Sequence, residues 1–219
     1  MKPSEQAIAA LVVTWLEDAG HDVYQEVEYR GAIIDIVVLV GPGKEVWVVE
    51  TKTRWSLELL TQCVERRAMA HRVFAGVPYS RVDHSQLFRQ LGVGSLIVRP
   101  DAYDEKVRCT HFPSRTTSRT RDWPRELRAR LGPGYKTHAK AGSPNGAGRW
   151  TPFRETCERL AYAAQAQPGI TLKDAIAGMT HHYSSAAAAR SSIRKWVELG
   201  KVPGVRLDRK EKLLRLFPS

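Results

Sequence analysis

The chain has 219 residues with an ordinary globular composition and a formal net charge of +11, which allows one large domain or two small ones. No apolar run approaches the roughly 18 residues of a membrane span, and no signal-peptide pattern is seen, so we expect a cytoplasmic protein without a membrane partner. The three cysteines lie far apart and form no CxxC pair, which argues against a zinc site or a disulfide framework.

The first predicted element is a helix between a Ser4 cap and Gly20. Its apolar residues recur at the spacing of one helical stripe, at Ile8, Leu11, Val12, Trp15 and Leu16. At about 100° per residue, Glu5 falls within this stripe, whereas Glu17 falls on the opposite face. Glu17 is therefore an ordinary solvated residue, and Glu5 is a candidate for a specific role.

Alternating strands and helices follow. Three strand-like runs cover residues 23–29, 32–40 and 45–53. The sequence 41-GPGK-44 is a strong turn signal between the last two runs. Ser56 caps a second helix, which we expect to end between Ala70 and Val73. A short strand, a helix and two more strands are then predicted over residues 73–78, 83–92, 95–99 and 105–112. This order predicts an α/β fold around a mixed central sheet.

The next segment, residues 113–150, is rich in Arg, Gly, Pro, Ser and Thr. Its part 122–132 has a capping Asp, an early Pro and a closing Gly, so we expect a short helix packed on the first domain. No apolar period follows this helix. We therefore expect a basic flexible linker over residues 132–150, between a domain at 1–131 and a second domain at 151–219.

The second domain begins with predicted helices over residues 152–166 and 172–178. A third helix is capped by Ser184 or Ser185 and closed by Gly200. Its apolar face is expected at Ala186, Ala189, Ile193, Trp196 and Val197.

Two short strands around the charged turn 208-DRKE-211 are predicted over residues 204–217. Three helices followed by a β-hairpin resemble the winged helix-turn-helix family. The resemblance implies that the third helix enters the major groove of duplex DNA and that the hairpin contacts the backbone. The contacts would come from Arg190, Ser191, Arg194 and Lys195 on the helix and from Arg206, Arg209 and Lys210 in the hairpin. A plain solvated helix face is the alternative.

The charge is unevenly distributed in a way that agrees with a nucleic-acid partner. Residues 1–112 carry a net charge of −2, residues 113–150 carry +7, and residues 151–219 carry +6. The C-terminal half is therefore the part that should bind a polyanion.

Charged residues also interrupt the two central strands. Asp35 lies within an apolar run, and Glu50 and Lys52 end the next one. Residues two apart share a face of a strand, and the tight turn makes these strands antiparallel neighbours. The three side chains can therefore converge at one end of the hairpin. Two carboxylates and an ammonium at one point are typical of a divalent-cation site beside a positive group.

An Asp followed about fifteen residues later by Glu-x-Lys, with a Glu on the preceding helix, resembles the PD-(D/E)xK, or restriction-endonuclease-like, nuclease superfamily. The resemblance covers roughly residues 4–112 and includes the αβββαβ order of that family's core. The family's Pro-Asp is Ile34-Asp35 here, and that proline is variable in the superfamily. The implied fold is a restriction-endonuclease-like core followed by a small winged-helix domain.

The resemblance also implies roles for individual residues. Asp35 and Glu50 would bind Mg²⁺ or Mn²⁺ together with the backbone carbonyl of Thr51. A water polarised by the metal would attack the scissile phosphate. Lys52 would position that water and stabilise the developing negative charge.

Two further residues have weaker counterparts in the family. Glu5 would hold a metal-bound water or a second metal. Gln62 would match a Gln found on the next helix in some branches, although it sits away from the Leu60–Val64 stripe of that helix. The structural alternatives are an Asp35–Lys52 salt bridge, an unpaired Glu5 favoured by the helix dipole, and a surface Gln62.

The leading hypothesis is a metal-dependent DNA endonuclease that hydrolyses phosphodiester bonds while its C-terminal domain holds duplex DNA. The alternative is a non-catalytic DNA-binding protein on a nuclease-like fold. A nuclease-fold domain followed by a winged helix also resembles the endonuclease subunit of some multi-protein transposases, which implies a transposase partner. Many superfamily members dimerise to cut both strands, so a homodimer is a further expectation. The sequence leaves the preferred DNA, the pathway and cleavage of RNA open.

Overall fold

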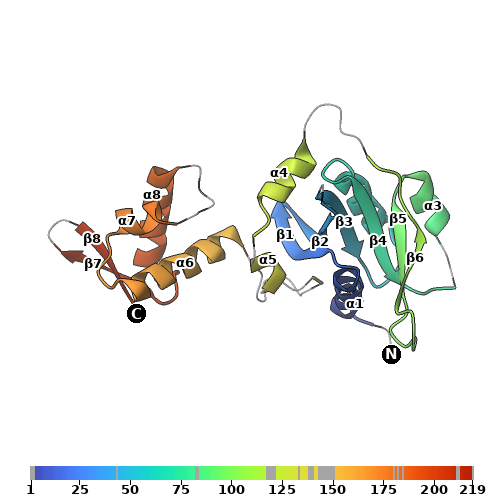
Figure 1. The fold of residues 1–219 in the computed structure, drawn as a ribbon, viewed down its shortest axis with the longest axis horizontal. Helices are drawn as coiled ribbons and strands as arrows, with labels where there is room; N and C mark the ends of the chain where they lie inside the picture. The colour runs from blue at the N-terminus through green and yellow to red at the C-terminus, as the bar shows by residue number, and fades with distance from the viewer. Residues whose placement is uncertain are drawn as a thin grey trace. The chain divides into compact units, whose positions relative to one another are not determined.

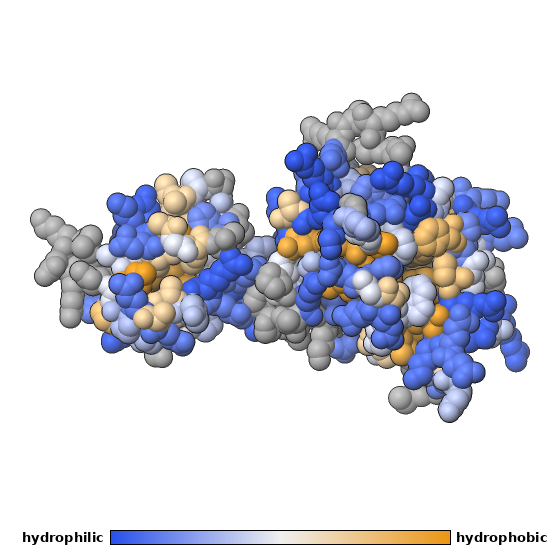
Figure 2. All heavy atoms as spheres, viewed as in Figure 1, coloured by the Kyte–Doolittle hydropathy of each residue, from blue (hydrophilic) through white to orange (hydrophobic). Residues whose placement is uncertain are grey.

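The computed structural model describes residues 3–42, 44–81, 84–116, 122–132, 134–137, 141–142, 151–179, 181, 183, 185–210 and 213–218. The chain divides into two compact units, Met1–Arg149 and Trp150–Ser219. Among the described residues no helix is long and apolar enough to cross a membrane. On the face shown in Figure 2, hydrophilic side chains cover most of the surface of each unit, with apolar side chains visible in smaller patches.

The N-terminal unit is built on a six-stranded sheet whose strands lie side by side in chain order (Figure 1). They are β1 (Asp22–Tyr29), β2 (Ala32–Val40), β3 (Glu45–Thr51), β4 (Arg72–Pro78), β5 (Gly94–Val98) and β6 (Val107–His111). β3, β4 and β5 run parallel, and the other neighbours pair antiparallel. The predicted α/β class and mixed central sheet are therefore confirmed.

One face of the sheet is covered by α1 (Glu5–Asp18). The Ser4 side chain caps this helix by accepting the Ala7 N–H at 3.1 Å. The buried side chains of the interface include Ile8, Val12 and Leu16 from the helix and Ile36, Val49 and Phe74 from the sheet. Leu11 and Trp15 pack against the margin of this cluster. The predicted stripe of the first helix is confirmed.

The other face is covered at β3 and β4 by α2 (Leu57–Arg66). Neighbouring residues of a strand point to opposite faces. Val49 belongs to the α1 cluster, and Glu50 contacts Arg66 of α2, so the two helices lie on opposite sides of β3. A third helix, α3 (Ser85–Gln90), packs near β5 and β6.

The structure corrects two expectations about α2. The helix ends at Arg66, before the expected Ala70–Val73, because short backbone bonds such as Met69 N–H to the Arg66 carbonyl, 2.8 Å, tighten the chain into a turn. The buried residues are Leu59, Cys63 and Arg66, and Val64 is 42% exposed, so the expected Leu60–Val64 stripe is wrong.

The expected linker also differs from the structure where its residues are described. After α4 (Trp123–Ala129) comes a short helix, α5 (Gly134–Thr137), which contacts β1. Tyr135 is buried, and Ala141 joins the α1 cluster. These residues therefore belong to the first unit. The expected domain boundary at residue 131, which was based on the absence of an apolar period after it, is wrong.

The C-terminal unit contains three helices followed by a two-stranded hairpin. They are α6 (Pro152–Ala166), α7 (Leu172–Ala177), α8 (Ala186–Glu198), β7 (Val205–Lys210) and β8 (Leu213–Pro218). The Ser185 side chain caps α8 by accepting the Ala188 N–H at 3.1 Å. The buried residues of α8 are Ala189, Ile193 and Val197. Ala186 is exposed and Trp196 is 37% exposed, so the apolar face of this helix is narrower than expected.

Candidate functional site

Antiparallel pairing of β2 and β3 brings Asp35 and Glu50 together. The paired register ends with Ile36 opposite Val49, and Asp35 and Glu50 are the next residues of the two strands beyond that pair. Ile36 and Val49 pack against α1, and the two carboxylates therefore point to the α2 side. Lys52 follows the end of β3, two residues beyond Glu50.

The Asp35 carboxylate is held by two hydrogen bonds from Thr51, one from its backbone and one from its side chain. Its Oδ2 accepts the Thr51 N–H at 2.7 Å and the Thr51 hydroxyl at 3.0 Å. Burial raises the pKa of Asp35 above its usual range, the two Thr51 hydrogen bonds oppose this effect, and the charge of Glu5 adds to it. The Oδ1 atom accepts no hydrogen bond from the described part of the chain.

Glu50 is tied to Arg66, a residue that the sequence analysis did not include. Arg66 Nε donates to Glu50 Oε1 at 2.6 Å, and the two side chains are only 5% and 2% exposed. A second Arg66 nitrogen, Nη2, donates to the Ile33 carbonyl at 3.0 Å. Arg66 continues the Leu59–Cys63 face of α2, but the apolar stripe expected at Leu60–Val64 pointed away from that face.

The charge state of Glu50 depends on two opposing effects. Burial, with the nearby charge of Asp35, raises the pKa of Glu50 to about 8, and the ion pair with Arg66 only partly offsets this. The group therefore exchanges between its neutral and ionised forms near neutral pH. Glu50 Oε2 accepts no hydrogen bond from the described residues, and a cation placed there would stabilise the ionised form.

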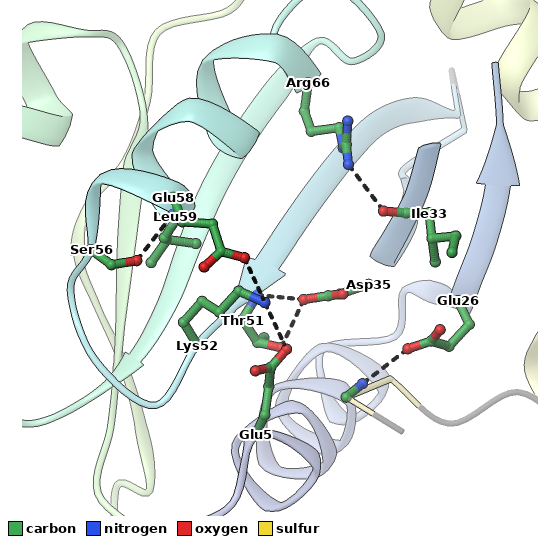
Figure 3. Close-up of polar contacts among 11 residues, drawn as sticks. Glu5, Glu26, Ile33, Asp35, Thr51, Lys52, Ser56, Glu58, Leu59 and Arg66 are labelled. Atoms are coloured by element: carbon green, nitrogen blue, oxygen red, sulfur yellow. Dashed lines mark hydrogen bonds and ion pairs between the residues drawn. The ribbon is translucent and has the colours of Figure 1, made fainter. Parts of the chain in front are cut away.

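Lys52 and Glu5 form a pair beside Asp35 (Figure 3). Lys52 Nζ donates to Glu5 Oε1 at 3.1 Å and lies 3.9 Å from Glu58 Oε1. Burial alone would lower the pKa of Lys52, but the Glu5 bond and the charges of Asp35 and Glu58 raise it above its usual value. The ammonium is thus protonated, and the alternatives of an unpaired Glu5 and an Asp35–Lys52 salt bridge are wrong.

Gln62 stands apart from these contacts. Its side chain is half-buried at the edge of the Leu59–Cys63–Arg66 face. Its Oε1 is buried without a hydrogen-bond partner in the part of the chain that the structure describes. No hydrogen bond joins Gln62 to Asp35, Glu50 or Lys52.

The segment 141–142 is fixed against the start of α1, next to Glu5. The Ala141 and Gly142 N–H groups each donate at 3.0 Å, to Gln25 Oε1 and Glu26 Oε1 respectively. A side chain on residue 142 would begin 2.6 Å from the Gln6 nitrogen and 2.8 Å from the Glu5 carbonyl carbon, and the φ of Gly142 is +74°. Only glycine fits this contact, which braces the turn of helix that carries Glu5.

The donor set fits a hard divalent cation. Asp35 and Glu50 each have one carboxylate oxygen without a hydrogen-bond partner among the described residues, and the Thr51 carbonyl comes from the same strand end. Among the described residues no group of three or more His, Cys, Asp or Glu side chains could hold a metal. A pair of carboxylates is nevertheless a common Mg²⁺ site, because waters and substrate phosphates complete its coordination.

The C-terminal unit presents several of the predicted DNA-binding residues to solvent. Arg190, Ser191, Arg194 and Lys195 are all exposed on α8. Arg194 Nε is engaged with Glu198 at 2.8 Å. Arg206 on β7 is exposed, with its guanidinium 5.5 Å from the Phe217 ring centre. The expected turn at 208–211 is wrong, because β7 continues through Lys210, which pairs with Leu213. The side chains of Arg209 and Lys210 lie outside what the structure describes.

No protein-family model matches the chain. No curated protein matches it either. Among solved structures, the chain is similar to a protein of unknown function from Silicibacter pomeroyi, at 19% identity and a TM-score of 0.45, over 59% of this chain and 85% of the other.

Proposed function

We propose that the protein is a metal-dependent DNA endonuclease whose active site lies at the carboxyl end of β3. The observation that supports this most is the neighbouring pair Asp35 and Glu50, each with an unpartnered oxygen, followed by the protonated Lys52. The shape of the site, two acids beside one fixed cation, suits phosphodiester hydrolysis, where negative charge develops on phosphate oxygens.

Asp35, Glu50 and the Thr51 carbonyl would hold Mg²⁺ or Mn²⁺. When bound, the ion supplies a water activated for attack and neutralises phosphate charge. Arg66 occupies one oxygen of Glu50 and keeps the other toward the site, as supporting hydrogen bonds commonly do for metal ligands. Thr51 does the same for Asp35.

Lys52 would act as a charge and not as a base, because its pKa is raised. Its ammonium would donate hydrogen bonds to the non-bridging phosphate oxygens and stabilise the transition state. Glu5 would orient this ammonium until the substrate phosphate competes for it.

The C-terminal unit would hold the DNA duplex through α8 and the β7–β8 hairpin. Exposed Arg190 and Lys195 on α8 support this proposal. Lys195→Ala should weaken duplex binding at all sequences and reduce the salt dependence of binding by about one unit in the log–log slope. Lys173→Ala, an exposed lysine on α7, is the matched control and should leave the slope unchanged.

Cleavage of duplex and branched DNA in Mg²⁺, Mn²⁺ or EDTA tests the main proposal. Lys52→Ala should lower the rate by about 10²–10³-fold and Asp35→Ala should abolish cutting, while DNA affinity stays near that of wild type. Lys44→Ala, at the opposite end of β3 in an exposed ion pair with Asp22, is the matched control. Cleavage by Lys52→Ala or Asp35→Ala at the wild-type rate would contradict this mechanism.

A non-catalytic DNA-binding protein is the second candidate. The buried Glu50–Arg66 pair and the lack of a third acidic ligand among the described residues favour it. Titration calorimetry with Mg²⁺ and Mn²⁺ separates the two proposals. Metal binding that Asp35→Ala removes supports the endonuclease, and no metal binding with intact DNA binding supports the second candidate.

A further inference from the structure

The N-terminal unit has a groove of about 420 Å³ and another of about 510 Å³. The groove of about 510 Å³ has no role in the mechanism above. Its lining includes Pro3, Thr53, Arg54, Trp55, Tyr79 and His84. Thr53 directly follows Lys52, and Pro3 lies two residues before Glu5. The groove is therefore lined by residues that adjoin both members of the Glu5–Lys52 pair along the chain.

Trp55 forms a fixed aromatic wall of this groove. Its ring centre lies 4.6 Å from that of Phe88, which is 2% exposed, and 6.5 Å from that of His84 in an edge-on contact. Trp55 is only partly buried, so part of the indole remains available. Anchoring by Phe88 means that a ligand would not have to immobilise the ring.

Tyr79 is a second ring, and it is unusually open for an aromatic residue. It is 61% exposed, and its backbone N–H is fixed to the Val98 carbonyl at 2.9 Å. The Arg99 guanidinium lies 4.6 Å from the centre of the ring. A cation on one face polarises the ring and holds it in place.

The chemistry of the lining selects an aromatic ligand that carries negative charge. Arg54 contributes a positive charge and His84 a ring that can form hydrogen bonds, and none of the described lining residues is acidic. Exposed rings combined with arginine are the usual platform for an unpaired nucleobase, because stacking needs a free π-face. A base within a duplex is stacked on its neighbours and cannot use such a platform until it leaves the stack.

We propose that this groove binds one unpaired nucleotide next to the phosphate that is cut, with the base on Tyr79 and Trp55 and its phosphate near Arg54. This inference rests on the proposed nuclease function and names its substrate class. The preferred DNA then carries a fork, a bulge or a displaced base at the cleavage site.

Binding in EDTA tests the groove without requiring any cleavage. The full chain is titrated into a duplex with one unpaired 2-aminopurine and into the matching paired duplex. Wild type should bind the unpaired form more tightly and quench its fluorescence. Tyr79→Ala should reduce this preference by about 5- to 150-fold, the usual effect of removing one base-stacking contact.

Two variants keep the test specific. Tyr79→Phe retains the ring and should retain the preference. Tyr103→Ala removes a 97% exposed tyrosine away from the groove lining and should behave as wild type. Equal affinity of wild type for the two duplexes, or a Tyr79→Ala variant with an unchanged preference, overturns the groove proposal. Metal-dependent cleavage without a preference for the unpaired duplex overturns only the groove proposal. A preference for the unpaired duplex without metal-dependent cleavage overturns only the nuclease proposal.

Discussion

Two glutamates on β3 each pair with an arginine, at opposite ends of the strand and in very different surroundings. Glu50 meets Arg66 at 2.6 Å with side-chain exposures of 2% and 5%. Glu45 meets Arg72 at 3.1 Å with exposures of 26% and 20%, and Arg115 adds a second cation at 3.5 Å. The same pair of residue types is therefore built once inside the core and once near the surface.

The difference shows that burial, more than the ion pair itself, sets the behaviour of each group. Water and a second arginine can replace a lost partner at Glu45. Neither is available at Glu50, and its pKa is raised to about 8 despite the arginine. A buried ion pair is weak evidence for stability and is often kept for another reason. Here that reason would be the fixed orientation of a metal ligand.

The largest effect is expected from breaking the buried pair. Arg66→Ala removes the hydrogen bonds to Glu50 and to the Ile33 carbonyl inside the core. We expect a loss of about 3–5 kcal/mol in the free energy of unfolding, measured by urea denaturation. The double change Glu50→Leu with Arg66→Met should recover most of this loss, because no charge is then left buried. A double variant as unstable as Arg66→Ala would contradict the comparison.

The next effect is the part of the pH dependence of stability that Glu50 contributes. Its pKa is raised to about 8 in the folded protein, from a usual 4.5, so between these values the native state binds more protons than the unfolded state. Stability should therefore fall as the pH rises from about 5 to 8, a window in which histidines also titrate, so the comparison with a Glu50 variant isolates its share. The midpoint of urea denaturation should change less across this window in Glu50→Gln than in wild type. An equal slope in that variant would assign the effect to another group.

A smaller effect is expected at the exposed end of β3. Glu45→Gln removes the charge but leaves Arg72 bonded to the Pro113 carbonyl and stacked over Phe112, with 4.7 Å from its guanidinium to the ring centre. The expected cost is about 0.2–1 kcal/mol by urea denaturation. A cost as large as that of Arg66→Ala would show that exposure does not separate the two pairs.

The smallest effect concerns Asp22, which binds Lys136 of α5 and Lys44, each at 2.7 Å. These two bonds lower the pKa of Asp22 to about 2, from a usual 3.8. Their contribution is complete above about pH 4 and is lost as the pH falls towards 2, because the unfolded state then binds the proton first. Asp22→Asn should remove this component, worth less than about 1 kcal/mol. Amide hydrogen exchange in α5 should become faster relative to Asp22→Asn controls as the pH falls from 4 to 2.5. Unchanged protection of α5 in wild type over this range would contradict the prediction.

Much of the candidate site follows from local pattern. Alternation along residues 32–40 and 45–51, with a turn between them, is enough to place Asp35 and Glu50 on one face. The stripe of the first helix likewise places Glu5 toward the sheet. These inferences succeed because strand and helix periods are properties of a few neighbouring residues.

Arg66 could not be found in this way. An arginine is normally exposed, so a count of apolar positions moves the predicted buried face of α2 toward Leu60 and Val64. Burial of Arg66 depends on Glu50, sixteen residues earlier and on another element. Only packing of α2 on β3 brings the two together.

The sequence by itself determined the order of elements, the mixed α/β class and the convergence of the charged residues. Tertiary structure decided which charges pair, and that the segment 141–142 fastens to β1 and the start of α1. That last contact uses two backbone N–H groups, two side-chain oxygens and a glycine at positive φ. Single contacts between distant segments have no period, and so they leave no pattern to read along the chain.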